Sequence, residues 1–138
     1  MADTQRAGLF AVLHASSVLE SRVEARLSHV GLSLAKLTAL YRLTEAGESL
    51  PLGQLAERLS CVKSNVTQLV DRLEADGLVN RTGDPNDRRS RLAILTEAGR
   101  SAYAKGHEIK MDAERELFGV LTAEESDTLH DLLRKLQR

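Results

Sequence analysis

The sequence is poor in the residues on which cross-linked folds and many kinds of chemistry depend. Its 138 residues include one cysteine, two prolines, two phenylalanines, two tyrosines and no tryptophan. A single cysteine excludes a disulfide within the chain, so the fold has to rest on an apolar core. No apolar run approaches the roughly 18 residues that span a membrane, and residues 1–6 show no secretory signal. We therefore expect a cytoplasmic protein with no membrane partner.

Motifs for catalysis and metal binding are also missing. The sequence has no glycine-rich phosphate loop, nucleophile elbow or metal-hydrolase motif, which argues against an enzyme. Four histidines are scattered without the spacing of metal ligands: His14, His29, His107 and His130. We expect no metal and no cofactor. Cys61 has no evident cationic neighbour, so we interpret it as a small buried hydrophobe rather than a redox centre.

Charge is unevenly distributed along the chain. The net charge is −1, so bulk positive charge gives no argument for nucleic-acid binding. Acidic residues crowd toward the C-terminal end, whereas four arginines lie in one short central stretch: Arg81, Arg88, Arg89 and Arg91. This pattern predicts a basic middle between acidic flanks.

Hydrophobic periodicity predicts a mainly helical chain. Residues 4–30 read as one long amphipathic helix that ends at Gly31, and Ser33 is placed to cap a second helix that runs to Gly47. Leu50 and Pro51 form a short extended piece. A third helix covers residues 52–59, with three residues on its inner face: Leu55, Ala56 and Leu59.

A fourth helix is predicted over residues 63–75, with an apolar face and a short, polar outer face. The period then changes to that of a β-hairpin, with strands at residues 78–82 and 91–95 and a turn over residues 83–87. Thr96 is placed to cap a fifth helix that runs to Phe118. Thr122 and Glu125 fit a capping box that opens a last helix.

Two short helices joined by a tight turn and followed by a β-hairpin predict a winged helix-turn-helix. The outer face of the fourth helix carries Ser64, Gln68, Asp71 and Ala75, with Asn65 and Arg72 beside them. Asn and Gln are suited to bidentate contacts with adenine in a major groove, and hairpin arginines are suited to a minor groove or to phosphates. The alternatives are a solvated helix face and a charged loop that serves only solubility. Asp87 is interpreted as an acceptor that holds the turn or orients an arginine.

These segments resemble the MarR (multiple antibiotic resistance regulator) family of transcription factors. Asp87 to Thr96, between Asp84-Pro85 and Glu97-Ala98-Gly99, is similar to that family's wing signature, and the segments 55–59 and 65–79 are similar to its helix-turn-helix. The resemblance implies a triangular homodimer in which the first, fifth and sixth helices intertwine and the two winged domains straddle a pseudo-palindromic operator. By position, it implies that the residues contacting double-stranded DNA are Lys63, Ser64, Asn65, Gln68, Arg72, Arg88, Arg89 and Arg91, with Asp87 organising the wing.

One departure from the family pattern concerns the start of the fourth helix. Val62 stands where a capping Ser or Thr is usual, so either Ser64 or a nearby group caps the helix, or the helix begins later. The register of the base contacts depends on which of these holds.

The expected organisation is one MarR-like domain over residues 1–138, in which residues 4–30 and 97–138 dimerise and residues 33–95 bind DNA. The apolar stripes of the terminal helices are too long for a compact monomer to cover, which favours a homodimer. The family resemblance further implies a small phenolic or other aromatic effector in a cleft with four candidate residues: His14, Ser17, Tyr41 and Arg42. The alternative function is an architectural or protein-interaction module without ligand response.

Overall fold

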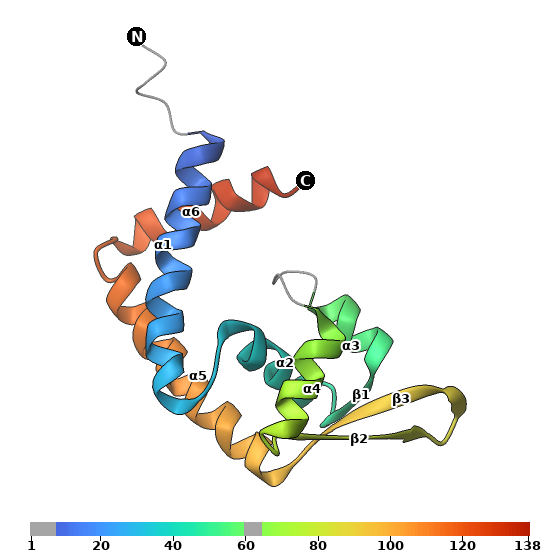
Figure 1. The fold of residues 1–138 in the computed structure, drawn as a ribbon. Helices are drawn as coiled ribbons and strands as arrows, with labels where there is room; N and C mark the ends of the chain where they lie inside the picture. Colours follow the sequence, from blue (N-terminus) through green and yellow to red (C-terminus); the bar gives the residue numbers. More distant parts are fainter. Residues whose placement is uncertain (1–7, 60–64) are drawn as a thin grey trace.

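The computed structural model describes residues 8–59 and 65–138, and the chain within them forms two parts (Figure 1). The long-helix part comprises α1 (Leu9–Leu27), α5 (Glu97–Phe118) and α6 (Ala123–Leu136). The winged part comprises α2 (Leu34–Glu45), β1 (Ser49–Pro51), α3 (Leu52–Arg58), α4 (Val66–Ala75), β2 (Val79–Asp84) and β3 (Asp87–Leu95). The predictions made for Cys61, Val62, Lys63 and Ser64 lie outside the described residues.

The long-helix part is built on α1 and α5, which pack side by side (Figure 1). An ion pair between Arg26 on α1 and Glu116 on α5 adds to this contact. The last turn of the first helix is a 3-10 helix, η2 (Ser28–Val30), and Gly31 ends it with a φ of 74°. The predicted stop at Gly31 is confirmed, because a left-handed residue of this kind closes helices and glycine adopts it without a steric penalty.

The winged part begins with a capped helix and contains a small sheet. The Ser33 hydroxyl accepts a hydrogen bond from the Lys36 amide at 3.1 Å, as predicted, and the Glu24 carboxylate of α1 accepts one from the Leu34 amide at 2.6 Å. The three strands are antiparallel in the order β1-β3-β2, so β3 is central. The short extended piece at Leu50 and Pro51 is thus part of the sheet.

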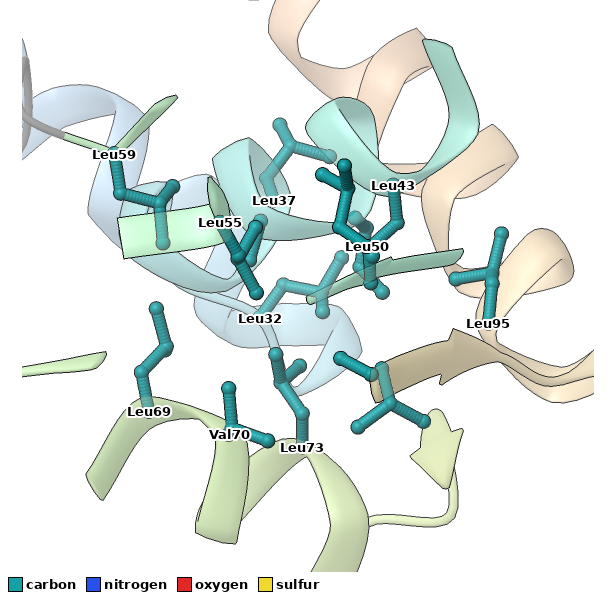
Figure 2. Close-up of a cluster of buried hydrophobic side chains, with 14 of the residues drawn as sticks. Leu32, Leu37, Leu43, Leu50, Leu55, Leu59, Leu69, Val70, Leu73 and Leu95 are labelled. Carbon is teal, nitrogen blue, oxygen red and sulfur yellow. The ribbon is translucent and has the colours of Figure 1, made fainter. Parts of the chain in front are cut away.

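The core of the winged part is made almost entirely of leucine and valine. Figure 2 shows Leu69, Val70 and Leu73 pointing from α4 toward side chains of the other elements. The predicted apolar face of α4 is confirmed, since Val66 is partly buried and Leu69, Val70 and Leu73 are buried. Leu55 on α3 and Leu59 just after this helix are buried as predicted, but Ala56 is exposed. The prediction for Ala56 was wrong because so short a helix covers the core with only one side.

Both predicted caps of the long C-terminal helices are present. The Thr96 hydroxyl accepts from the Gly99 amide at 2.9 Å and donates to the Gly77 carbonyl at 2.7 Å, so it joins the start of α5 to the end of α4. Thr122 and Glu125 form a reciprocal capping box at the start of α6. The prediction of a mainly helical chain with a β-hairpin is confirmed, although the hairpin itself differs in detail from the predicted one.

Candidate nucleic-acid interface

The exposed face of α4 is short and polar, and the residue just before this helix, Asn65, caps it. The Asn65 side chain accepts a hydrogen bond from the Gln68 amide at 3.2 Å, and α4 begins at Val66. The predicted start at Lys63 was therefore too early, and the later start foreseen from the missing capping residue at Val62 is the one observed. Asn65 uses its oxygen on the helix, which satisfies one of the amides that a helix start leaves without a partner.

Two of the predicted DNA contacts lie together on this face of α4. Gln68 and Arg72 are exposed and one helical turn apart, while Leu69 and Leu73 anchor the opposite side in the core. The helix therefore presents an amide and a guanidinium to solvent from a rigid base. Side chains held in this way reach base edges and phosphates at a low cost in conformational entropy.

The hairpin is longer and its turn tighter than predicted. β2 runs to Asp84 and β3 starts at Asp87, so the predicted five-residue turn over 83–87 reduces to Pro85 and Asn86. Gly83 pairs with Arg91 but Asp84 pairs with Asp87, so β3 carries three extra residues, Arg88 to Ser90, with no counterparts on β2. This bulge breaks the two-residue alternation on which the sequence prediction rested.

The bulge places the predicted wing arginines at the far end of the hairpin. Arg88, Arg89 and Arg91 are exposed, and none of them forms an ion pair with a described residue. The Asp87 carboxylate accepts a hydrogen bond from the Arg89 amide at 2.9 Å, and Asp84 accepts one from the Asn86 amide at 2.9 Å. These two local bonds are of the kind that a turn-holding role for Asp87 requires, and they leave the arginine side chains facing solvent.

Arg81, the fourth arginine of the basic stretch, is engaged within the protein. Its guanidinium reaches two carboxylates of α4, with Nη2 at 2.6 Å from Asp71 Oδ1 and at 2.8 Å from Glu74 Oε1. The hydrogen bond from Arg81 holds the pKa of the Glu74 carboxyl below its ordinary value, and the same bond raises the pKa of Arg81. This arrangement of Arg81 was not predicted from the sequence, because no local pattern shows which arginine of a strand faces a helix.

A cavity lies between α2 and α5, where the winged part meets the long-helix part. Its volume is about 340 Å³, and it is lined by Leu34, Leu37, Thr38, Tyr41, Tyr103, His107 and Lys110. The rings of Tyr41 and Tyr103 stack with centroids 6.1 Å apart, and His107 follows Tyr103 at 5.6 Å. Both tyrosines of the chain thus line one cavity, and burial raises the pKa of the Tyr103 hydroxyl, which stays protonated near neutral pH.

Of the four predicted ligand residues, only Tyr41 lines this cavity. His14 and Ser17 are exposed on α1 and do not line it. Arg42 stacks over the Tyr41 ring at 5.3 Å, donates to the Arg58 carbonyl and pairs with Glu45. Sequence reasoning missed Tyr103, His107 and Lys110 because they reach the cavity from a helix much further along the chain.

Large apolar side chains remain exposed at the far end of the long-helix part. On α1 and next to α5, the exposed fraction is 84% for Phe10 and 83% for Val120, and on α6 it is 70% for Leu136. The remaining members of this set are Leu9, Val12, Leu13, Met111, Phe118, Leu129, Leu132 and Leu133. Clusters of exposed apolar side chains on a folded chain mark interaction surfaces.

Within the described residues, no helix has the length and apolarity needed to cross a membrane. The same part of the chain contains no group of three or more His, Cys, Asp or Glu side chains that is arranged to hold a metal ion.

The comparisons with known proteins agree with this geometry. The family model described as the MarR family matches residues 32–90, which include α2 to α4 and most of the hairpin. The chain is 33% identical to the multiple antibiotic resistance protein MarR of Escherichia coli over 80% of this chain and 76% of that protein. It is also 38% identical to YkoM, an uncharacterised HTH-type transcriptional regulator of Bacillus subtilis, over 61% of this chain and 54% of YkoM.

A solved structure matches nearly the whole chain. A cysteine-to-serine mutant of E. coli MarR complexed with operator DNA has a TM-score of 0.82 and 28% identity, covering 92% of this chain and 91% of that one. The winged helix-turn-helix prediction is thereby confirmed at the level of the fold. The chain spans only 54% to 66% of the length of several curated relatives. Several of the similar proteins and solved structures are described as transcriptional regulators.

Proposed function

The chain belongs to the MarR family, and we propose that it is a sequence-specific DNA-binding regulator that acts as a homodimer on a pseudo-palindromic operator. The observation that carries the proposal is the pairing of two solvent-facing elements in one part of the chain. The polar face of α4 and the wing arginines, which form no ion pair with a described residue, are both exposed, while the opposite side of α4 is buried in the core. A module of this kind places a helix in a major groove and a hairpin beside it.

In this proposal the side chains divide into two roles. Gln68 reads base edges from α4, and Lys63, Ser64 and Asn65, which precede Val66 in the sequence, are further candidates for contacts with bases or phosphates. Four arginines bind phosphates or enter the minor groove: Arg72, Arg88, Arg89 and Arg91. Asp87 holds the turn between β2 and β3. Phosphate contacts of this kind release counterions, so local positive charge is sufficient even though the net charge of the chain is −1.

The homodimer supplies the second recognition helix. The exposed apolar residues of α1, α5, α6 and the segment after α5 form the surface that a second copy would cover. A closed twofold interface buries the same patch on both chains. One such interface would therefore cover the exposed apolar residues of both copies. Residues 4–30 and 97–138 then serve dimerisation, and residues 33–95 serve DNA binding.

Selection of bound duplexes from a random-sequence pool tests this function. We expect an enriched sequence with twofold symmetry, with half-sites about 10 base pairs apart or at a multiple of that spacing. The mass of the free protein in solution should equal that of two chains. A monomer, or equal binding of all duplexes, would contradict the proposal, and the second result would favour an architectural module.

Changing Arg89 to Ala should weaken binding to the selected duplex. The exposed Arg89 guanidinium has no partner among the described residues, and its loss should reduce the slope of log K against log salt by about 1. Lys105→Ala, which removes one exposed positive charge from α5, is the matched control and should leave the slope unchanged. Equal slopes for the native and Arg89→Ala proteins would remove Arg89 from the interface.

We further propose that the cavity between α2 and α5 binds an aromatic effector and that the protein is a repressor which this effector releases. The stacked Tyr41 and Tyr103 rings offer a face to an aromatic ligand, and Lys110 offers a positive charge to a phenolate or carboxylate. An ion pair joins α2 to the C-terminal end of α4: Lys36 Nζ lies 3.0 Å from Oδ2 of Asp76, the residue that follows this helix. A ligand that separates α2 from α5 would thus shift α4 and the spacing of the two recognition helices.

A thermal-shift screen of substituted phenols and aromatic acids checks the effector proposal. We expect at least one compound to raise the melting temperature of the native protein, because a ligand that binds only the folded state stabilises it. The shift should disappear in Tyr103→Ala and persist in Tyr103→Phe, which keeps the ring. A flat screen, or equal shifts in all three proteins, would contradict the assignment of this cavity.

A further inference from the structure

Arg81 joins the wing to α4 by polar contacts, in addition to the apolar core that the two elements share. Besides its bonds to Asp71 and Glu74 through Nη2, Arg81 donates from Nε to Glu74 Oε1 at 3.2 Å and from its own backbone amide to Glu74 Oε2 at 3.2 Å. Both oxygens of Glu74 are therefore bound to β2. We call this group of Arg81, Asp71 and Glu74 the Arg81 clamp.

The clamp lies at the edge of the proposed DNA-binding face. Asp71 is one helical turn from Gln68, and its side chain is 52% exposed, whereas the Arg81 side chain is 24% exposed. The guanidinium is therefore the more buried partner of the pair. Without it, two negative charges of α4 would stand unpaired beside a polyanion, where like charges oppose binding.

We propose that Arg81 is a positioning residue for DNA binding, which fixes the wing to the recognition helix and cancels the charge of Asp71 and Glu74. The inference rests on the proposed function for its DNA-binding consequence, but the mechanical part stands on the clamp alone. A planar guanidinium contacts two carboxylates with a fixed geometry, and an ammonium group does not reproduce that geometry. Arg81 thus adds to the buried contacts between α4 and the sheet in fixing the angle of the hairpin, without contacting DNA itself.

The mechanical part is tested without DNA, by hydrogen exchange. In Arg81→Gln, the backbone amides of β2 and β3 should exchange faster than in the native protein, while those of α1 and α5 should be unchanged. Arg81→Lys should give an intermediate rate, because it keeps the charge and loses the paired contacts. Identical exchange over residues 79–95 in the native and Arg81→Gln proteins would overturn the clamp, whatever the protein binds.

The electrostatic part is tested with the duplex that the native protein selects. Arg81→Gln should bind that duplex roughly tenfold more weakly or worse, with an unchanged salt slope, because no phosphate contact is lost. Adding Asp71→Asn and Glu74→Gln should restore most of the affinity. A triple variant that stays as weak as Arg81→Gln, with a slope reduced by about 1, would show that Arg81 binds phosphate itself and would overturn the proposal.

Failure of the proposed function gives a different result from failure of the clamp. If the native protein selects no duplex, the regulator proposal fails while the hydrogen-exchange comparison still decides the mechanical role. If the native protein selects a duplex and Arg81→Gln binds it equally well, the DNA-binding consequence of the clamp fails and the regulator proposal remains.

Discussion

The Gly99→Ala variant is expected to unfold at a lower temperature than the native protein. Gly99 is buried in the first turn of α5, against the chain that enters β2 and the end of β3. A Cβ at this position would overlap the Leu78 carbonyl oxygen and lie 2.7 Å from Leu95 Cδ1. Because the first of these atoms belongs to the backbone, α5 and the sheet would have to move apart.

The expected cost is about 1–3 kcal/mol of the free energy of unfolding, typical of added volume at a packed site. It should appear in thermal or urea unfolding at a fixed protein concentration. Gly53→Ala is the matched control, since Gly53 also lies in the first turn of a helix but has open space around it. That change should stabilise the protein by about 0.5–1 kcal/mol through helix propensity. Equal effects of the two substitutions would show that α5 does not pack against Leu78 and Leu95 as described.

The Leu73→Ala variant should lose the most stability of any single change on α4. The Leu73 side chain is fully buried in the core of the winged part, which holds α4 in place (Figure 2). Truncation removes apolar contacts and leaves a cavity, at a cost of about 2–5 kcal/mol. Urea unfolding followed by circular dichroism measures this loss.

Gln68→Ala on the opposite face of the same helix separates stability from recognition. Gln68 is exposed, so its replacement should change the free energy of unfolding by no more than about 0.5 kcal/mol. It should instead relax the base preference at one position of each half-site in a repeated selection. If Gln68→Ala destabilised the protein as much as Leu73→Ala, the two faces of α4 would have been assigned the wrong way round.

Much of the fold could be predicted because the signals are local. Caps such as Ser33, Thr96 and the Thr122–Glu125 pair depend on residues three or four apart, and so does the buried face of α4. The same local reasoning anticipated a late start for α4 from the absence of a capping residue at Val62. It could not say that Asn65 would be the cap, because Ser64 has the same capacity.

The features that were missed depend on residues far apart in the sequence. The pairing of β1 with β3, the cavity formed by Tyr41 with Tyr103, and the Arg81 clamp all join separate elements. A bulge such as that at Arg88 to Ser90 also leaves no clear sequence signal. Its extra residues interrupt the alternation of apolar and polar residues that identifies a strand, so the segment resembles part of a turn. For the candidate site, composition located the basic stretch but not which arginine is engaged internally.

The three residues of β3 without partners on β2 bear on how the tip of the wing can vary between related proteins. The register of Ala93 and Leu95 against β2 is set below the bulge, so the core beneath the hairpin does not depend on how many residues lie above Gly83 and Arg91. Insertions or deletions at the tip would change how far its cations extend while leaving the interior intact. Reach toward a neighbouring molecule and stability of the protein are therefore separable traits, and evolution or protein engineering can adjust one without disturbing the other.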